Sequence, residues 1–86
     1  MGLQWHDEAW EDYLYWQTQD KKTLKRINNL IKDAQRSLFE GIGKPEPLKN
    51  ELSGWWSRRI DDCNRIVYKE QDGNIIIASC KGHYEG

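Results

Sequence analysis

The chain has little cysteine, little proline and no long apolar run. Of its 86 residues, two are Cys and two are Pro, and 37% are hydrophobic. So few cysteines exclude the disulfide framework of a small secreted domain, and no Cys/His cluster has zinc-ligand spacing. There is no apolar signal segment at the N-terminus, and the most apolar run, NIIIASC at 74–80, is too short to cross a bilayer. We expect a single reduced, cytoplasmic domain over residues 1–86, without metal or cofactor.

Charge is divided unevenly along the chain, although the net charge is only −1. Residues 1–20 carry five acidic side chains and no Lys or Arg, whereas residues 21–36 carry six basic side chains and one acid. Residues 44–69 carry six further bases against four acids. This segregation predicts an anion-binding face, although a basic run on one helix is more often simply its solvated surface.

The order of the hydrophobic patterns predicts an α+β fold. A short edge strand at 3–5 precedes two amphipathic helices, the first over 6–20 and the second capped by Asp20. The second helix has a continuous apolar stripe: Leu24, Ile27, Ile31, Ala34 and Leu38. Three Gly and two Pro in 39–54 cannot continue this helix. Strands are expected at 55–60, 65–70 and 74–81, and the Asp-Gly pair before Asn74 predicts a hairpin.

Helices followed by strands favour an antiparallel sheet that the helices cover on one face only. Side chains alternate along a strand, so Trp55, Ser57 and Arg59 are expected on the face opposite to Arg58 and Ile60. A regular last strand would place Ile75, Ile77, Ser79, Lys81 and His83 on one side, and a bulge would switch that side. The sequence alone does not decide which face is open.

Two residues are candidates for acid–base chemistry. Glu46 lies between Pro45 and Pro47, whose fixed φ angles stiffen the segment around its carboxylate, although it is also typical of an exposed acid in a loop. His83 near the C-terminus can exchange a proton near neutral pH, and His6 is expected to be structural. With Arg side chains for phosphate and Tyr84 for base stacking, this inventory supports cleavage of RNA.

Several segments together resemble one known protein family. They are WEDYLYWQ at 10–17, the run from INNLIKDAQ to GWWSRRI at 27–60, NRIVY at 64–68 and HY at 83–84. These segments are similar to the YoeB/Txe toxins, a branch of the RelE superfamily. The resemblance covers residues 5–84 without gaps, and the combination of GKPEPLK, LSGWWSRRI and RIVY is highly specific.

The resemblance implies the toxin of a bacterial type II toxin–antitoxin pair, which a cognate antitoxin neutralises. Members of the family are endoribonucleases that cleave messenger RNA in the A site of the 70S ribosome, and several are homodimers. The implied fold is a microbial-RNase-like α+β domain of the RelE type. In it, two N-terminal helices pack on one face of a twisted antiparallel sheet.

Position by position, the family's catalytic groups match Glu46, Arg65 and His83. Glu46 is expected to accept the proton of a 2′-hydroxyl, Arg65 to stabilise the phosphorane and His83 to protonate the leaving oxygen. The substrate-binding positions of the family match a second set: Tyr84, Lys49 and Arg59. Two other hypotheses stay open, a translation inhibitor that occupies the A site without cleavage and a module that only binds an antitoxin.

Overall fold

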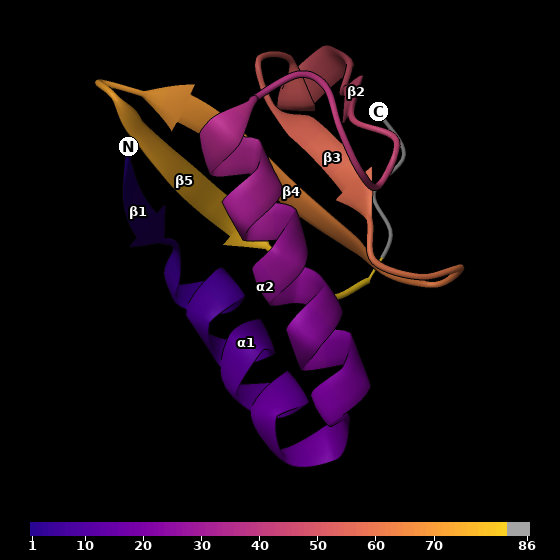
Figure 1. Ribbon diagram of the computed structural model, residues 1–86. Coiled ribbons are helices and arrows are strands. Elements are labelled where there is room, and N and C mark those ends of the chain that lie inside the picture. Colours follow the sequence, from indigo (N-terminus) through magenta and orange to yellow (C-terminus); the bar gives the residue numbers. More distant parts are fainter. Residues whose placement is uncertain (83–86) are drawn as a thin grey trace.

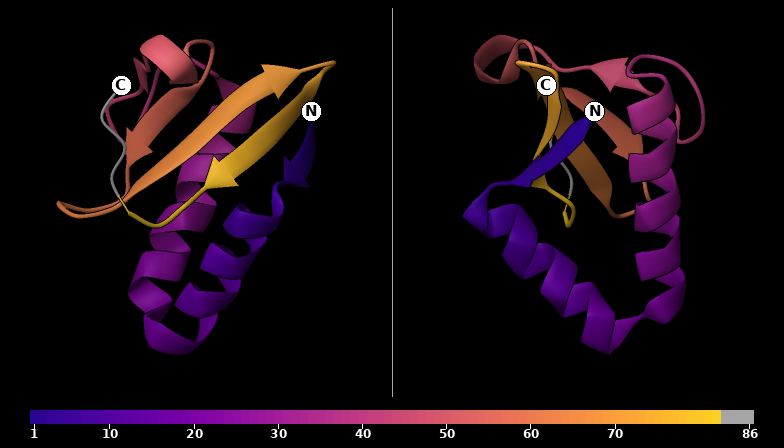
Figure 2. Two further views of the ribbon diagram at one scale, coloured as in Figure 1. Left: turned by 180° about the vertical axis from the view of Figure 1, so that it is seen from behind. Right: turned by 60° about the vertical axis from the view of Figure 1, so that its left-hand side comes forward.

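The computed structural model describes residues 1–82, in which two helices pack against a five-stranded sheet. Figure 1 shows α2 crossing one face of the sheet, with α1 beside it. Seen from behind, β4 and β5 lie in front of α2, and neither α-helix crosses the near face (Figure 2). The elements are β1 (Gly2–Trp5), α1 (Asp7–Gln19), α2 (Lys21–Arg36), β2 (Glu46–Pro47), a 3₁₀ helix (Asn50–Leu52), β3 (Trp56–Arg59), β4 (Arg65–Gln71) and β5 (Asn74–Ser79).

The predicted α+β class, with helices on one face of the sheet, is confirmed. The strand order is β1-β5-β4-β3-β2, and β2 to β5 are antiparallel neighbours. The sheet is mixed rather than wholly antiparallel, because the edge strand β1 runs parallel to β5. The spacing of apolar residues contains no strand direction, so this pairing was not predictable from it. Neither helix in residues 1–82 is long and apolar enough to cross a membrane.

Helix α2 begins at the predicted cap. One carboxylate oxygen of Asp20 accepts hydrogen bonds from the backbone N–H of Lys22 at 3.0 Å and of Thr23 at 3.2 Å. The buried apolar side chains of α2 form the predicted stripe, with Leu30 added: Ile27, Leu30, Ile31 and Ala34. The helix ends at Arg36, so Leu38 packs against the core from the following segment and not from the helix.

The hairpin between β4 and β5 turns at Asp72 and Gly73, which both have positive φ angles, 53° and 80°. Positive φ at both central positions characterises the type I′ turn, whose twist matches that of paired strands, and the predicted hairpin is confirmed.

Alternation in β5 is interrupted at Ala78, so Ile77 and Ser79 do not share one side, and the bulged alternative holds in place of the regular strand. Val67 pairs with Ser79 and Tyr68 with Ile77, which leaves Ala78 as an extra residue. Ile77 belongs to the core under the helices, whereas Ser79 lies on the opposite face with Val67. A β-bulge of this kind re-aims every following side chain.

Arg58 of β3 is fully buried and ties the helical layer to the sheet. Its Nη1 donates to Asp33 Oδ2 at 2.7 Å, and its Nε donates to Tyr68 Oη at 3.0 Å. Its guanidinium also donates to four carbonyl oxygens of the segment after α2, at 2.6–3.5 Å: those of Ser37, Leu38, Glu40 and Ile42. A buried charge with this many partners holds the 37–42 segment against the sheet.

We expect Arg58→Met to lower the free energy of unfolding by about 3 kcal/mol or more, because it leaves a carboxylate and several carbonyls without their donor. The matched control is Arg36→Met. Arg36 contacts the same Asp33, but its side chain is 70% exposed, and we expect a change below about 0.5 kcal/mol. Urea denaturation followed by tryptophan fluorescence measures both, and equal losses would contradict the role of Arg58.

Asp33 makes stability depend on pH. Hydrogen bonds from Arg36 and Arg58, and from the N–H of Ile42, hold the pKa of Asp33 well below its ordinary value. A depressed folded-state pKa stabilises the protein fully above the unfolded value near ~3.9, and the contribution is lost as pH falls toward the folded value. Unfolding free energies at pH 2–6 should therefore decline more steeply below pH ~4 in the wild type than in Asp33→Asn. Parallel curves would contradict this.

Candidate functional site

The sheet face that the helices leave open carries a row of side chains across four strands. Glu46 of β2 is the Cα partner of Ser57 in β3, Ser57 of Val67 in β4, and Val67 of Ser79 in β5. Ser57, Val67 and Ser79 are buried, yet none belongs to the core cluster under the helices. The row forms the floor of a second surface, with Glu46 at its edge.

Glu46 and Arg65, two of the predicted site residues, are in direct contact on this face. Arg65 Nη1 donates to Glu46 Oε1 at 2.7 Å and to Ser57 Oγ at 3.3 Å. The Glu46 side chain is 56% exposed and that of Arg65 is 20% exposed. A carboxylate that solvent can reach, beside a guanidinium fixed by a buried hydroxyl, can accept a proton next to a bound phosphate.

The strand β2 explains how Glu46 is held. The sequence predicted a stiff Pro-Glu-Pro segment, and in the structure Glu46 and Pro47 also pair with Ser57 and Trp56 of β3. The N–H of Leu48 continues this pairing by donating to the carbonyl of Trp55 at 2.9 Å. Glu46 is therefore part of the sheet and not of a free loop.

The chain just before the predicted His83 is anchored beside Arg65. The N–H of Gly82 donates to Asn64 Oδ1 at 2.8 Å, and the N–H of Arg65 donates to the carbonyl of Gly82 at 2.9 Å. Gly82 has a φ of 87°, a left-handed conformation that glycine adopts without steric cost. The backbone can therefore hold this conformation between its two hydrogen bonds without strain. His83 and Tyr84 themselves lie outside the described residues.

Cys80 is a second anchor of the same segment. Its carbonyl accepts from Trp16 Nε1 at 2.9 Å, and its N–H donates to Asp12 at 3.0 Å. Burial raises the pKa of the Cys80 thiol to about 12, so it stays protonated near neutral pH. Burial likewise raises the pKa of Asp12, against the opposing effect of the Cys80 N–H.

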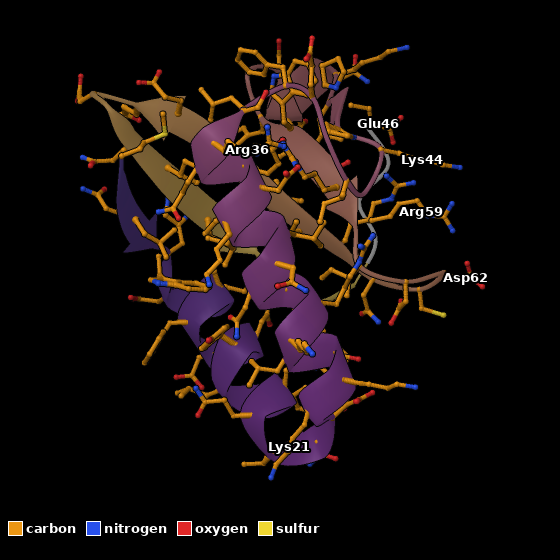
Figure 3. All side chains as sticks on the ribbon, in the orientation of Figure 1. Lys21, Arg36, Lys44, Glu46, Arg59 and Asp62 are labelled. Atoms are coloured by element: carbon orange, nitrogen blue, oxygen red, sulfur yellow. The ribbon has the colours of Figure 1, made fainter. Side chains whose placement is uncertain are left out.

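Lys49 and Arg59, the other predicted basic residues, form no hydrogen bond or ion pair with Glu46 or Arg65. Lys49 is exposed beside the 3₁₀ helix, where it lines a hollow of about 310 Å³. Arg59 is the Cα partner of Arg65, but its guanidinium bonds Asp62 Oδ1 at 2.8 Å. Figure 3 shows Arg59 at the same edge of the molecule as Glu46.

Ser57 and Asn64 are site residues that the sequence reasoning did not select, although both lie in segments that carry the family resemblance, GWWSRRI and NRIVY. Side-chain alternation predicted that Ser57 and Arg59 share one face of β3, and the structure confirms it. Alternation did not predict the hydrogen bond that Ser57 accepts from Arg65. Asn64 directly precedes the RIVY strand, and its contact with Gly82 joins residues 18 positions apart. Within residues 1–82, no group of three or more His, Cys, Asp and Glu side chains is placed to hold a metal.

Replacing Glu46 or Arg65 by Gln should change the free energy of unfolding by less than about 1 kcal/mol, because solvent screens an ion pair with one largely exposed partner. Urea titration measures this directly. A loss of several kcal/mol from either substitution would identify the pair as structural and remove the argument that it is kept for binding or chemistry.

The chain is similar to known proteins over nearly its whole length. Residues 5–84 match the family model of the YoeB-like toxin of bacterial type II toxin-antitoxin systems. The chain is 57% identical to toxin YoeB of Escherichia coli K12, over 98% of this chain and 100% of that protein. Two solved structures from Staphylococcus aureus each cover 98% of both chains at 49% identity. They are a YoeB dimer, with a TM-score of 0.91, and a heterotetrameric YoeB–YefM toxin–antitoxin complex, with a TM-score of 0.90. The chain belongs to the YoeB family of toxins of bacterial type II toxin–antitoxin systems.

Proposed function

We propose that this toxin is an endoribonuclease that cleaves messenger RNA in the A site of the 70S ribosome and so stops translation. The observation that carries the proposal is the direct contact of Glu46 with Arg65 on the open face of the sheet. The anchored Gly82 beside Arg65 supports it, because it precedes His83 in the chain.

The reaction uses the 2′-hydroxyl of RNA as its nucleophile. Glu46 accepts the proton of this hydroxyl while the oxygen attacks the adjacent phosphorus, and Arg65 stabilises the negative charge of the phosphorane. His83 donates a proton to the 5′-oxygen as its bond to phosphorus breaks. The products are a 2′,3′-cyclic phosphate and a 5′-hydroxyl, and DNA is not a substrate because it lacks the nucleophile.

The Glu46–Arg65 contact also describes the state of the site when no RNA is bound. The guanidinium is shared between the carboxylate and Ser57 Oγ, so a phosphate that enters the site competes for the same donors. Binding of the phosphate to Arg65 releases Glu46 to accept a proton. In this proposal Lys49 and Arg59 bind the RNA backbone, and Tyr84 stacks on or hydrogen-bonds a base.

We further propose a cognate antitoxin and a homodimer as the partners of this chain. The support is the family of the chain and the two Staphylococcus aureus assemblies, one a YoeB dimer and the other a toxin–antitoxin complex. Because the proposed target is the ribosome, we propose the cytoplasm as the place where the toxin acts.

Cleavage is tested in a translating extract by mapping the ends of the message at stalled codons. We expect Glu46→Ala and His83→Ala each to slow cleavage by ~10²–10⁴-fold. Arg65→Ala should slow it by ~10²–10³-fold, as for a lost charge stabiliser. The control is Lys21→Ala, an exposed side chain at the start of α2 that should leave the rate unchanged (Figure 3).

The same experiment separates cleavage from occupancy. Full cleavage by all three variants would refute the mechanism. Stalled ribosomes with intact messages, and inhibition that survives Glu46→Ala, would instead identify a toxin that blocks the A site by binding. A 2′-deoxy nucleotide at the cleavage position should stop the reaction, because it removes the nucleophile and leaves the phosphate in place.

A further inference from the structure

Three basic side chains surround a hollow next to the site. The hollow has a volume of about 270 Å³ and lies where β3 ends. Its lining residues come from α2, from the segment before β2 and from the end of β3: Arg26, Gly43, Lys44, Arg59, Ile60 and Asp61. Lys44 and Arg26 are absent from the site described above, and neither is part of the predicted set.

Hydrogen bonds to the backbone join the segments that carry the three basic residues. Arg26 Nη2 donates to the carbonyl of Arg59 at 3.1 Å, and the N–H of Arg59 donates to the carbonyl of Gly43 at 2.7 Å. Gly43 has a φ of 81°, and a Cβ there would lie 2.6 Å from Leu30 Cδ2. The backbone next to Lys44 therefore packs closely against the core, and only glycine at position 43 allows this approach without strain.

The two acidic residues at this hollow offset only part of the charge of its three basic side chains. Asp61 is committed to the turn before β4, since its Oδ1 accepts from the N–H groups of Cys63 and Asn64 at 2.8 Å and 2.7 Å. Asp62 bonds Arg59, but its side chain is 95% exposed, so solvent screens the pair and an anion can replace it. Within residues 1–82, neither Lys44 nor Arg26 forms an ion pair with a carboxylate.

The hollow lies beside the strand position that carries Arg65. Arg59 and Arg65 are Cα partners on neighbouring strands, which places their Cα atoms roughly 4.5–5.5 Å apart. Figure 3 shows Lys44 and Arg59 projecting from the same edge of the molecule as Glu46. Positive side chains therefore extend from the proposed cleavage position around the end of β3 toward α2.

We propose that Arg26, Lys44 and Arg59 form a second phosphate-binding site, which holds an RNA backbone phosphate adjacent to the one that is cleaved. Guanidinium groups bind phosphate oxygens in pairs, and an exposed ammonium adds a point charge without sequence preference. The site rests on the proposed function and extends it by assigning backbone binding to two residues outside the catalytic pair. The phosphate belongs either to the message or to ribosomal RNA.

The decisive variant is Lys44→Gln, with Lys21→Gln as its control. Both replace an exposed Lys by Gln, but Lys21 lies at the far end of α2 (Figure 3). The probe is a fluorescent single-stranded RNA with 2′-O-methyl groups, which binds without being cleaved. Its affinity is measured by anisotropy between 25 and 200 mM salt, and Arg26→Gln and Arg26→Lys are measured in the same series.

The plot of log K against log salt has a negative slope, and each lost phosphate contact reduces its magnitude by about 0.7 for a single strand. We expect this change for Lys44→Gln and Arg26→Gln, with roughly fivefold weaker binding at 0.1 M salt, and no change for Lys21→Gln. Arg26→Lys keeps the charge and should retain most of the slope, which separates charge from a local folding defect.

A second arm measures binding to 70S ribosomes with and without message. Loss of affinity for the oligonucleotide assigns the phosphate to the message, and loss confined to ribosomes without message assigns it to ribosomal RNA. Wild-type slopes and ribosome affinities in Lys44→Gln and Arg26→Gln would overturn the proposal. If the wild type proves not to cleave while the slope change persists, the phosphate site stands and the proposed cleavage fails, so the two failures are distinguishable.

Discussion

The buried guanidinium of Arg58 is the interaction on which the rest of the structure depends. It joins Asp33 near the end of α2, Tyr68 of β4 and the carbonyls of the segment that follows α2. That segment leads directly into the strand that holds Glu46. An apolar side chain at position 58 would fill the same space but would leave those carbonyls unpaired in the interior. Arg58 therefore holds the segment that leads into β2, and the pairing of β2 with β3 then places the site's carboxylate.

Stability and the proposed chemistry occupy opposite faces of the same strand. In β3, Arg58 points into the core, while its neighbours Ser57 and Arg59 face the open side. The ion pair on the open side has one largely exposed partner, Glu46, and we expect it to contribute little to stability. In the proposed reaction, this leaves its geometry free to change when a phosphate binds. The anchored Gly82 and the basic hollow flank this pair, in a family whose members are toxins of type II systems.

Much of the fold was predictable because its signals are local. The Asp20 cap, the apolar stripe of α2 and the Asp-Gly hairpin each depend on residues close together in sequence, and all three were confirmed. The parallel pairing of β1 with β5 and the bulge at Ala78 were not predictable from the sequence pattern, because both depend on contacts between distant segments. The motif match selected Glu46 and Arg65, which the structure brings together; the roles of these residues, and of His83 and Tyr84, remain predictions.

By itself, the sequence determined the α+β class, the segregation of positive charge and the membership of a toxin family, since composition, periodicity and motifs are properties of the linear chain. Only the tertiary structure decided that Arg65 lies between Glu46 and Ser57, and that Gly82 is fixed beside it. It also decided that Arg26 and Lys44 share a hollow with Arg59. Such groupings join positions far apart in the chain through strand register and helix packing, which sequence spacing does not encode.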